Sequence, residues 1–146
     1  MLKIAVTKGT IRTSTWDTLY NHLQTGTYAL STNNIFSAWN STLASDKGYP
    51  LVIIESPIVS FKKENINGEY TNSEIVFNLE VYHNSAQNVK ALVDAITNSL
   101  LTGKVIFEAQ RMMNMIISGG TNSAWEEGKK KIHLIGFSVS FRYISN

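Results

Sequence analysis

Three histidines are the side chains of this chain best suited by type to proton transfer or metal binding. His22, His83 and His133 stand far apart in the sequence, and none is followed at i+2, i+3 or i+4 by a second metal ligand. The chain contains no cysteine, which excludes disulfides and thiolate metal ligands. We therefore expect each histidine to be an ordinary structural residue and expect no metal site.

The carboxylates do not form a recognisable catalytic set. Glu126 and Glu127 are adjacent, so their side chains would diverge on a strand, and Glu80 and Asp94 fall on the expected polar faces of a strand and a helix. An acid–base pair needs convergent carboxyl groups whose pKa values are pushed apart. The chain also lacks the GxSxG, Walker and GxGxxG motifs. We expect a protein that is not an enzyme and uses no cofactor.

The segment with the most unusual composition begins at a tryptophan near the C-terminus that we expect to lie in a loop. Aromatic residues anchor protein interfaces and charged rims orient a partner, so this segment is a candidate protein–protein interface. A solvated hairpin loop with the tryptophan folded back is the alternative, and the three lysines give a weak signal for DNA phosphate. The candidate residues are Trp125, Glu126, Glu127, Lys129, Lys130 and Lys131.

A second candidate interface is the hairpin that carries Lys62 and Lys63 and turns at Asn67-Gly68. Asn-Gly favours a tight hairpin because both turn positions need a positive φ. A projecting arm of this kind can pair with a neighbour's sheet. The lysines can instead simply protect an edge strand from unwanted pairing.

Charge is scarce in this chain. Charged residues are 16% of the total, against about 25% in typical proteins, and the net charge is +2 with a pI near 8.8. Hydrophobic residues at 43% exclude a disordered chain, and the mild charge argues against a nucleic-acid-binding module. The uncharged polar surface indicates either a surface covered by partners or an AT-rich genome that encodes many asparagines.

Hydrophobic periodicity then places the elements that must position these residues. Apolar positions at helical spacing, with capping residues, predict helices over Ser14 to Gly26, Asn34 to Leu43 and Ser85 to Gly103. Lys104 to Arg111 is ambiguous between strand and helix. The remaining segments read as strands separated by turns, with a loop at 119–128; the expected strands are 51–54, 58–63, 73–83, 112–118 and 131–144.

This order of elements needs few parallel crossovers, which favours the α+β class. We expect a mainly antiparallel sheet of about four to five strands with a long hairpin, packed by two to three helices in a single domain over residues 1–146. The first residues carry too short an apolar run for a signal peptide, and no stretch is long enough to span a membrane.

The pattern resembles the tail terminator, or tail-completion, proteins of long-tailed phages and proviruses. The resemblance is carried by the order of elements from about Trp16 onward and by no diagnostic motif. A helix leads to the strand Tyr49-Pro50-Leu51-Val52-Ile53-Ile54, a hairpin leads to the strand ending at Tyr82, a capped helix follows, and the last long strand ends near Tyr143.

The resemblance implies a structural virion protein with no catalytic residues. Such proteins form a ring, usually a hexamer, that caps the tail tube, meets the head-completion or neck protein and lets DNA pass without sequence-specific binding. It implies a virion location in the tail or neck after assembly in the host cytoplasm. The alternatives are another tail or neck component, such as a tube subunit or connector, and a small ligand-binding or enzymatic α+β domain.

Overall fold

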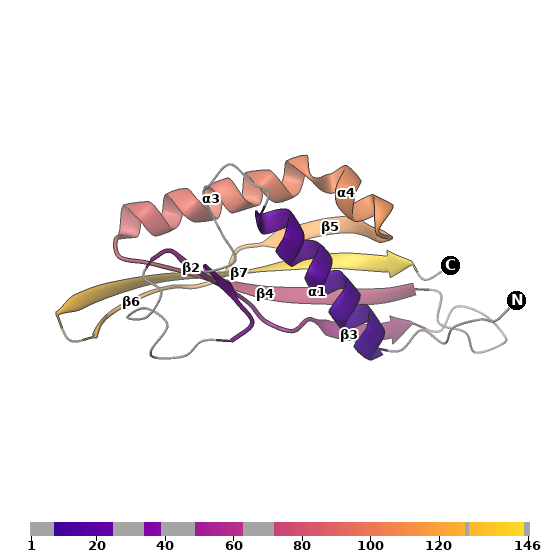
Figure 1. Cartoon of the computed structure of the whole chain (residues 1–146), viewed down its shortest axis with the longest axis horizontal. Coiled ribbons are helices and arrows are strands. Elements are labelled where there is room, and N and C mark those ends of the chain that lie inside the picture. The colour runs from indigo at the N-terminus through magenta and orange to yellow at the C-terminus, as the bar shows by residue number, and fades with distance from the viewer. Residues whose placement is uncertain (1–7, 25–33, 39–48, 63–71, 128, 145–146) are drawn as a thin grey trace, which may run out of the picture.

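Two layers, one of helices and one of strands, form the fold (Figure 1). The computed structural model describes residues 8–24, 34–38, 49–62, 72–127 and 129–144. In chain order the elements are α1 (Lys8–Gln24), β1 (Ile35–Phe36), β2 (Leu51–Ile54), β3 (Ile58–Lys62), β4 (Asn72–His83), α3 (Ala86–Thr102), α4 (Lys104–Ala109), β5 (Met112–Ser118), β6 (Asn122–Glu127) and β7 (Lys130–Ile144).

The two longest strands, β4 and β7, form the centre of the sheet. They pair antiparallel without interruption from Asn72 opposite Ile144 to His83 opposite His133. β4 is flanked by β2 and then β3, and β7 is flanked by β6 and then β5, while β1 pairs parallel to β2. The expected α+β class with a mainly antiparallel sheet is confirmed. Among the described residues the sheet has seven strands rather than four to five, because β1 and β6 were not expected.

Both flanks are interrupted near the middle of the sheet, at levels that differ by two residue pairs. Residues 55–57 stand opposite Phe77 and Asn78, and residues 119–121 stand opposite Gly136 and Phe137. Each interruption therefore carries one residue more than the strand it faces, which is the geometry of a β-bulge and bends a sheet. The bend divides the sheet into an outer half near the β6–β7 turn and an inner half near the C-terminus.

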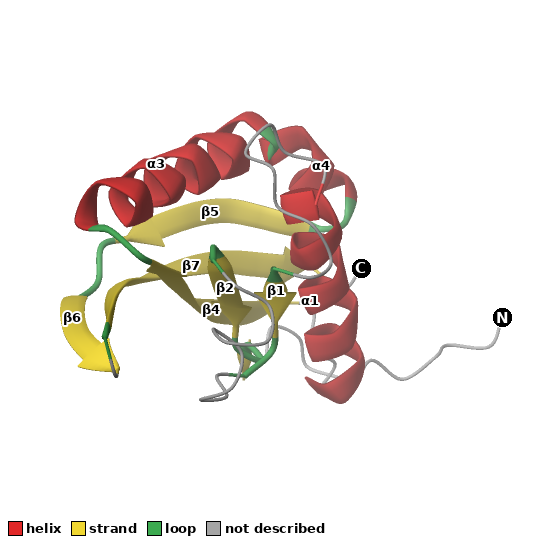
Figure 2. Ribbon diagram, turned by 60° about the vertical axis from the view of Figure 1, so that its left-hand side comes forward, coloured by secondary structure: helices red, strands yellow, loops and turns green. Residues whose placement is uncertain are grey.

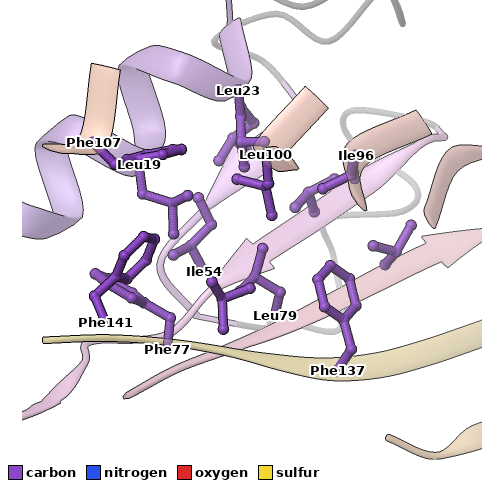
Figure 3. Packing of buried hydrophobic residues seen from close by; sticks show 14 of the residues in the cluster. Leu19, Leu23, Ile54, Phe77, Leu79, Ile96, Leu100, Phe107, Phe137 and Phe141 are labelled. Atoms are coloured by element: carbon purple, nitrogen blue, oxygen red, sulfur yellow. The ribbon is translucent and has the colours of Figure 1, made fainter. Parts of the chain in front are cut away.

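The helices cover one face of this sheet and enclose the main core. α3 runs along β4 and β7, α1 crosses β3, and α4 lies over β5 (Figures 1 and 2). Figure 3 shows side chains from both layers pointing into the space between them. The fully buried members include Leu19, Leu23, Ile54, Phe77, Leu79, Ile96, Leu100 and Phe141.

The helix predicted over Ser85 to Gly103 is confirmed as α3, together with its cap. The Ser85 hydroxyl accepts a hydrogen bond from the Asn88 amide at 3.1 Å, as an N-cap should. The predicted apolar stripe faces the sheet, with Val89, Leu92, Ile96 and Leu100 buried. The ambiguous segment after Gly103 is a short helix, α4, and the strand expected at 112–118 is confirmed as β5.

The first helix begins earlier than predicted. Its buried face, which includes Leu19 and Leu23, is confirmed, but the helix starts at Lys8 and Ser14 is not its cap. Ile11 and Thr15 are also buried, so the amphipathic face extends almost two turns upstream. The Ser14 carbonyl accepts a hydrogen bond from the Thr18 hydroxyl at 2.9 Å inside the helix. The predicted end at Gly26 lies outside the described residues.

Two predicted elements were wrong. The helix expected over Asn34 to Leu43 is not formed where the structure describes this segment. Ile35–Phe36 is instead a short strand, because the Asn34 carbonyl accepts a hydrogen bond from the Val52 amide at 2.8 Å and Ile35 pairs with Val52. The loop expected at 119–128 contains strand β6, which pairs with β7. In both cases a partner distant in sequence determines the local structure. The remainder of the first segment, 39–43, lies outside the described residues.

The expected hairpin between the third and fourth strands is confirmed as an antiparallel pair. Ile58 lies opposite Val76 and Lys62 opposite Asn72. The Asn67-Gly68 turn itself lies outside the described residues. Asn114 has a φ of 52° beside an irregularity in β5, a conformation that asparagine tolerates better than most residues.

Candidate functional site

The tryptophan of the first candidate interface is held by the sheet rather than by a loop. Trp125 lies on β6 opposite Ile132, is half-buried, and its ring meets the Tyr82 ring edge-on with centroids 6.0 Å apart. It packs against a second apolar cluster in the outer half, on the sheet face that none of the described helices covers, which we call the helix-free face. The buried members of this cluster are Leu51, Ile53, Tyr82 and Ile132. The tryptophan therefore closes this cluster and exposes only part of its ring.

The charged residues of this candidate lie along the end of the β6–β7 hairpin. Glu126 pairs in register with Lys131 and Glu127 with Lys130, so each acidic position on β6 lies opposite a basic position on β7. Glu126, Lys129 and Lys131 are exposed. Opposite charges placed across an antiparallel pair stabilise it modestly and give the hairpin end a mixed rather than a basic character.

The second candidate lies at the other end of the sheet. Lys62 ends β3 opposite Asn72, whereas Trp125 contacts Tyr82, ten positions further along β4. At about 3.4 Å per residue, the two groups are separated by roughly 34 Å. The structure therefore does not bring Lys62 together with the β6–β7 hairpin, and Lys63 lies outside the described residues.

A cluster that the sequence did not indicate lies in the crease where the sheet bends. The Tyr82 hydroxyl donates a hydrogen bond to Glu80 Oε2 at 2.6 Å. Ile53 of β2 pairs with Glu80, and Glu55 follows β2 directly, so the carboxyl groups of Glu55 and Glu80 lie close enough to interact. They border an open groove of about 320 Å³ on the helix-free face, together with Asn78 and Gly120. Glu55 and Glu80 are far apart in sequence, so only the β2–β4 register could have revealed the pair.

The crease changes the proton affinity of two groups. The hydrogen bond to Glu80 raises the pKa of Glu55, and burial and the Glu80 charge act in the same direction, while Asn78 opposes them. Burial raises the pKa of Tyr82, assisted by its hydrogen bond to Glu80. Tyr82 thus remains a neutral donor, and Glu55 holds its proton to a higher pH than a free glutamate does.

Glu55→Gln should raise the melting temperature relative to wild type as the pH increases. The raised pKa means that the folded protein holds the Glu55 proton more tightly than the unfolded chain, so the associated stability is present at acid pH. That stability is lost as the pH rises from the unfolded pKa, about 4.5, through the folded pKa. Thermal melts from pH 4 to pH 8 measure the difference.

The difference should be small because Glu55 is exposed. Glu80→Gln removes the same carboxyl repulsion and should change the pH dependence in the same direction. A variant-minus-wild-type difference in melting temperature that is flat across this pH range would contradict the coupling of the two carboxyl groups.

The inner half of the helix-free face is open, and few of its described side chains are charged. One row crosses four strands, since Ile116 pairs with Ser140, Ser140 with Val76 and Val76 with Ile58. Ile58 and Ile116 are each 61% exposed at the two sides of this row. Ser60, Asn78, Ser118 and Ser138 supply most of the neighbouring polar groups, and Glu74 lies opposite Arg142.

A second apolar surface lies on the helix layer, at the corner between α3 and α4. Leu101 is 55% exposed, Val105 74% and Ile106 53%. Phe107 points the other way, into the core, where its ring packs against Phe141 with centroids 5.2 Å apart. Exposed aliphatic side chains that cluster in this way mark interaction surfaces more often than isolated ones do.

The histidines have structural surroundings in the part of the chain that is described. His22 is buried between α1 and α3, with Nε2 2.9 Å from the Ser99 carbonyl, and Gly103 is the residue that leaves room for its ring. His83 and His133 lie opposite each other, which the sequence did not reveal. No group of three or more potential metal ligands is found among the described residues.

A groove of about 550 Å³ lies beside α1. It is open to solvent and is bordered by Arg12, Trp16, Asp17 and Ser56 among others. The Trp16 indole donates a hydrogen bond to the Ile54 carbonyl at 2.8 Å, so its ring position is fixed by the sheet. The groove has charged and aromatic walls but no nucleophile–base pair among its described residues.

Comparison with known proteins does not place the chain in a family. No protein-family model matches it, and no curated protein matches it. In the described part of the chain, no helix is long and apolar enough to cross a membrane.

Proposed function

We propose that this chain is a structural virion protein of a long-tailed phage or provirus, and that it is the tail terminator. In this role it forms a ring that caps the tail tube and joins it to the head-completion protein of the neck, with DNA passing through the ring. The observation that carries the proposal is the helix-free face of the inner half. That face exposes Ile58 and Ile116, and the charged residues among its described side chains are Glu74 and Arg142, which lie opposite each other.

In a monomer, the residues that point to the solvent-exposed face of a sheet are ordinarily polar, and many of them are charged. Depletion of charge with retained aliphatic area is instead the composition of a surface that a protein partner covers. The low charge of the whole chain, 16%, follows the same trend. A ring supplies such cover repeatedly, because every subunit contacts two neighbours.

The order of elements also supports the proposal. The helix α1, the strand β2, the β3–β4 pair, the capped helix α3 and the long strand β7 follow one another as in the resemblance drawn from the sequence. The partners in this proposal are further copies of the chain, the tail tube protein and a head-completion or neck protein. No catalytic chemistry and no cofactor are part of it.

Two other functions are distinguished by the same experiment. A tube subunit or connector would use similar surfaces but would stack into open-ended assemblies. A small ligand-binding or enzymatic domain is favoured by the groove beside α1, with its Trp16 ring and its Arg12 and Asp17 charges. Such a domain would not need to self-associate.

The experiment is the mass of the purified protein in solution, followed by electron microscopy of the same sample in negative stain. We expect closed rings with a channel wide enough for duplex DNA. Open-ended tubes would favour a tube subunit and contradict the terminator role. A monomer at all concentrations that binds a small molecule saturably in the α1 groove would support the ligand-binding function instead.

A further inference from the structure

The large hydrophobic side chains that are exposed in the described residues fall into two groups on opposite layers. We call Ile58, Val76 and Ile116, together with Ile144 four residues beyond Ser140 on the same face of β7, the sheet patch. We call Leu101, Val105 and Ile106 the helix corner. The sheet patch faces away from the helices, because its residues alternate with the buried Ile75 and Phe77. The helix corner faces away from the sheet.

The sheet patch offers a surface on which the end of a partner's helix can pack. Its row of side chains crosses β5, β7, β4 and β3, with isoleucines at the two sides and Ser140 and Val76 between them. An open groove of about 350 Å³ borders Ile116, Ser140 and Asn114. Because Ser140 is small, the row is lower at its centre. Three side chains from a partner, each about the size of isoleucine, would fill this space.

The helix corner has the complementary shape. α4 is short and projects Val105 and Ile106 outward while Phe107 anchors it in the core. Its ion pair joins Lys104 Nζ to Glu108 Oε1 at 3.6 Å beside these two side chains. The helix corner is therefore a protruding apolar surface with one positively and one negatively charged side chain beside it.

The charges of the two surfaces also match. On the sheet patch, Glu74 and Arg142 lie directly opposite each other on β4 and β7. In one orientation of a corner on a patch, Lys104 meets Glu74 and Glu108 meets Arg142. Complementary charges of this kind select the orientation of a complex more than they add affinity.

We infer that the helix corner of one copy of this chain packs on the sheet patch of the next copy. The inference rests on the proposed ring and names the contact that builds it. An isologous contact of either surface with itself would cover one patch and leave the other exposed. A corner-on-patch contact is heterologous, covers both, and generates a ring when its rotation closes.

Two variants that each destroy one surface test this contact. Val105→Asp places a charge on the helix corner, and Ile116→Asp places one on the sheet patch; both positions are exposed, so the fold should be retained. Each variant alone should self-associate at least about tenfold more weakly than wild type, because the contact would bury an unpaired charge. Light scattering and ultracentrifugation give the masses.

The mixture of the two variants provides the decisive measurement. Val105→Asp retains an intact sheet patch and Ile116→Asp retains an intact helix corner, so one corner-on-patch contact can form between them. The mixture should stop at a one-to-one dimer. Ala91→Asp, exposed on α3 about 15 Å along the helix from the corner, adds the same charge and should assemble as wild type does.

Chemical cross-linking gives a second measurement, because the chain has no cysteine of its own. Val105→Cys and Ile116→Cys, mixed and treated with a short bismaleimide, should give a cross-linked dimer in higher yield than either variant alone. Equal yields in all three samples would overturn the contact.

Other outcomes separate this inference from the proposed function. Closed wild-type rings that persist in both aspartate variants would overturn the contact while supporting the ring. Open-ended wild-type assemblies that both variants abolish would support the contact and contradict the terminator role. Loss of association in Ile116→Asp alone would indicate a sheet-to-sheet contact, and a wild-type monomer at every concentration would overturn the contact.

Discussion

Phe77→Ala is expected to lower the free energy of unfolding by about 3–5 kcal/mol, the cost of removing a buried aromatic side chain. Phe77 is completely buried at the centre of β4, and its ring meets Phe141 edge-on with centroids 6.2 Å apart. The cavity would open in the middle of the core shown in Figure 3, between the sheet and the helices. Because single domains are stable by only about 5–15 kcal/mol, this loss removes a large share of the total.

Urea denaturation followed by circular dichroism measures this loss, with Val76→Ala as the matched control. Val76 is the preceding residue on the same strand but points to the helix-free face, where it is only half-buried. We expect Val76→Ala to cost about 1 kcal/mol or less, within the range of strand propensities. Equal losses in the two variants would mean that the core does not lie on the side assigned to it.

Gly120→Ala is expected to destabilise the protein by about 3 kcal/mol, at the upper end of the cost of overpacking. A Cβ at this position would overlap the carbonyl oxygen of Gly136 and lie 2.6 Å from its carbonyl carbon. Both groups belong to the backbone of the sheet bend, where the Gly136 amide also donates to the Thr121 carbonyl at 2.9 Å. No side-chain rotation can relieve such an overlap, so the β5–β6 connection must move.

The neighbouring glycine provides the control for this prediction. A Cβ at Gly119 would have no heavy atom within 4 Å, so Gly119→Ala should change the free energy of unfolding by no more than about 0.5 kcal/mol. Thermal and urea melts of both variants measure the contrast. A Gly120→Ala protein as stable as Gly119→Ala would show that β5 and β6 can separate from β7 at the bend without cost.

The bend that Gly120 permits also organises the helix-free face. On its outer side Tyr82 and Trp125 belong to an apolar cluster, while on its inner side Ile58 and Ile116 remain exposed. The crease with Glu55 separates the two regions. A variant that disturbs the bend should therefore alter self-association as well as stability, whereas Phe77→Ala acts through the core alone.

Local sequence patterns were sufficient to predict the elements that have a clear hydrophobic period of their own. The Ser85 cap and the stripe from Val89 to Leu100 specify α3, and the alternation from Ile135 to Tyr143 specifies β7 with its correct inward face. The α+β class follows from the order of these elements. The absence of cysteine likewise excludes thiol chemistry without any structure.

Residues 119–128 lacked such a pattern, and the helical spacing found over Asn34 to Leu43 was misleading at Ile35–Phe36, because short or polar segments carry few periods. β6 and β1 exist through hydrogen bonds to β7 and β2, partners that a reading of neighbouring residues cannot supply. The start of α1 was misplaced because Ser14 has the residue type of an N-cap, whereas its carbonyl accepts the Thr18 hydroxyl at 2.9 Å inside a helix that begins at Lys8.

The candidate sites also divide into those that the sequence indicated and those that only the structure revealed. Sequence composition alone indicated Trp125 and the charges that follow it, and it determined that this is a low-charge chain without a recognisable catalytic motif. Only the tertiary structure decided that Glu55 meets Glu80 and that Ile58 shares one exposed row with Ile116. Periodicity along a chain shows which side chains share a face of one element, whereas strand register and layer packing determine which faces meet and which remain exposed.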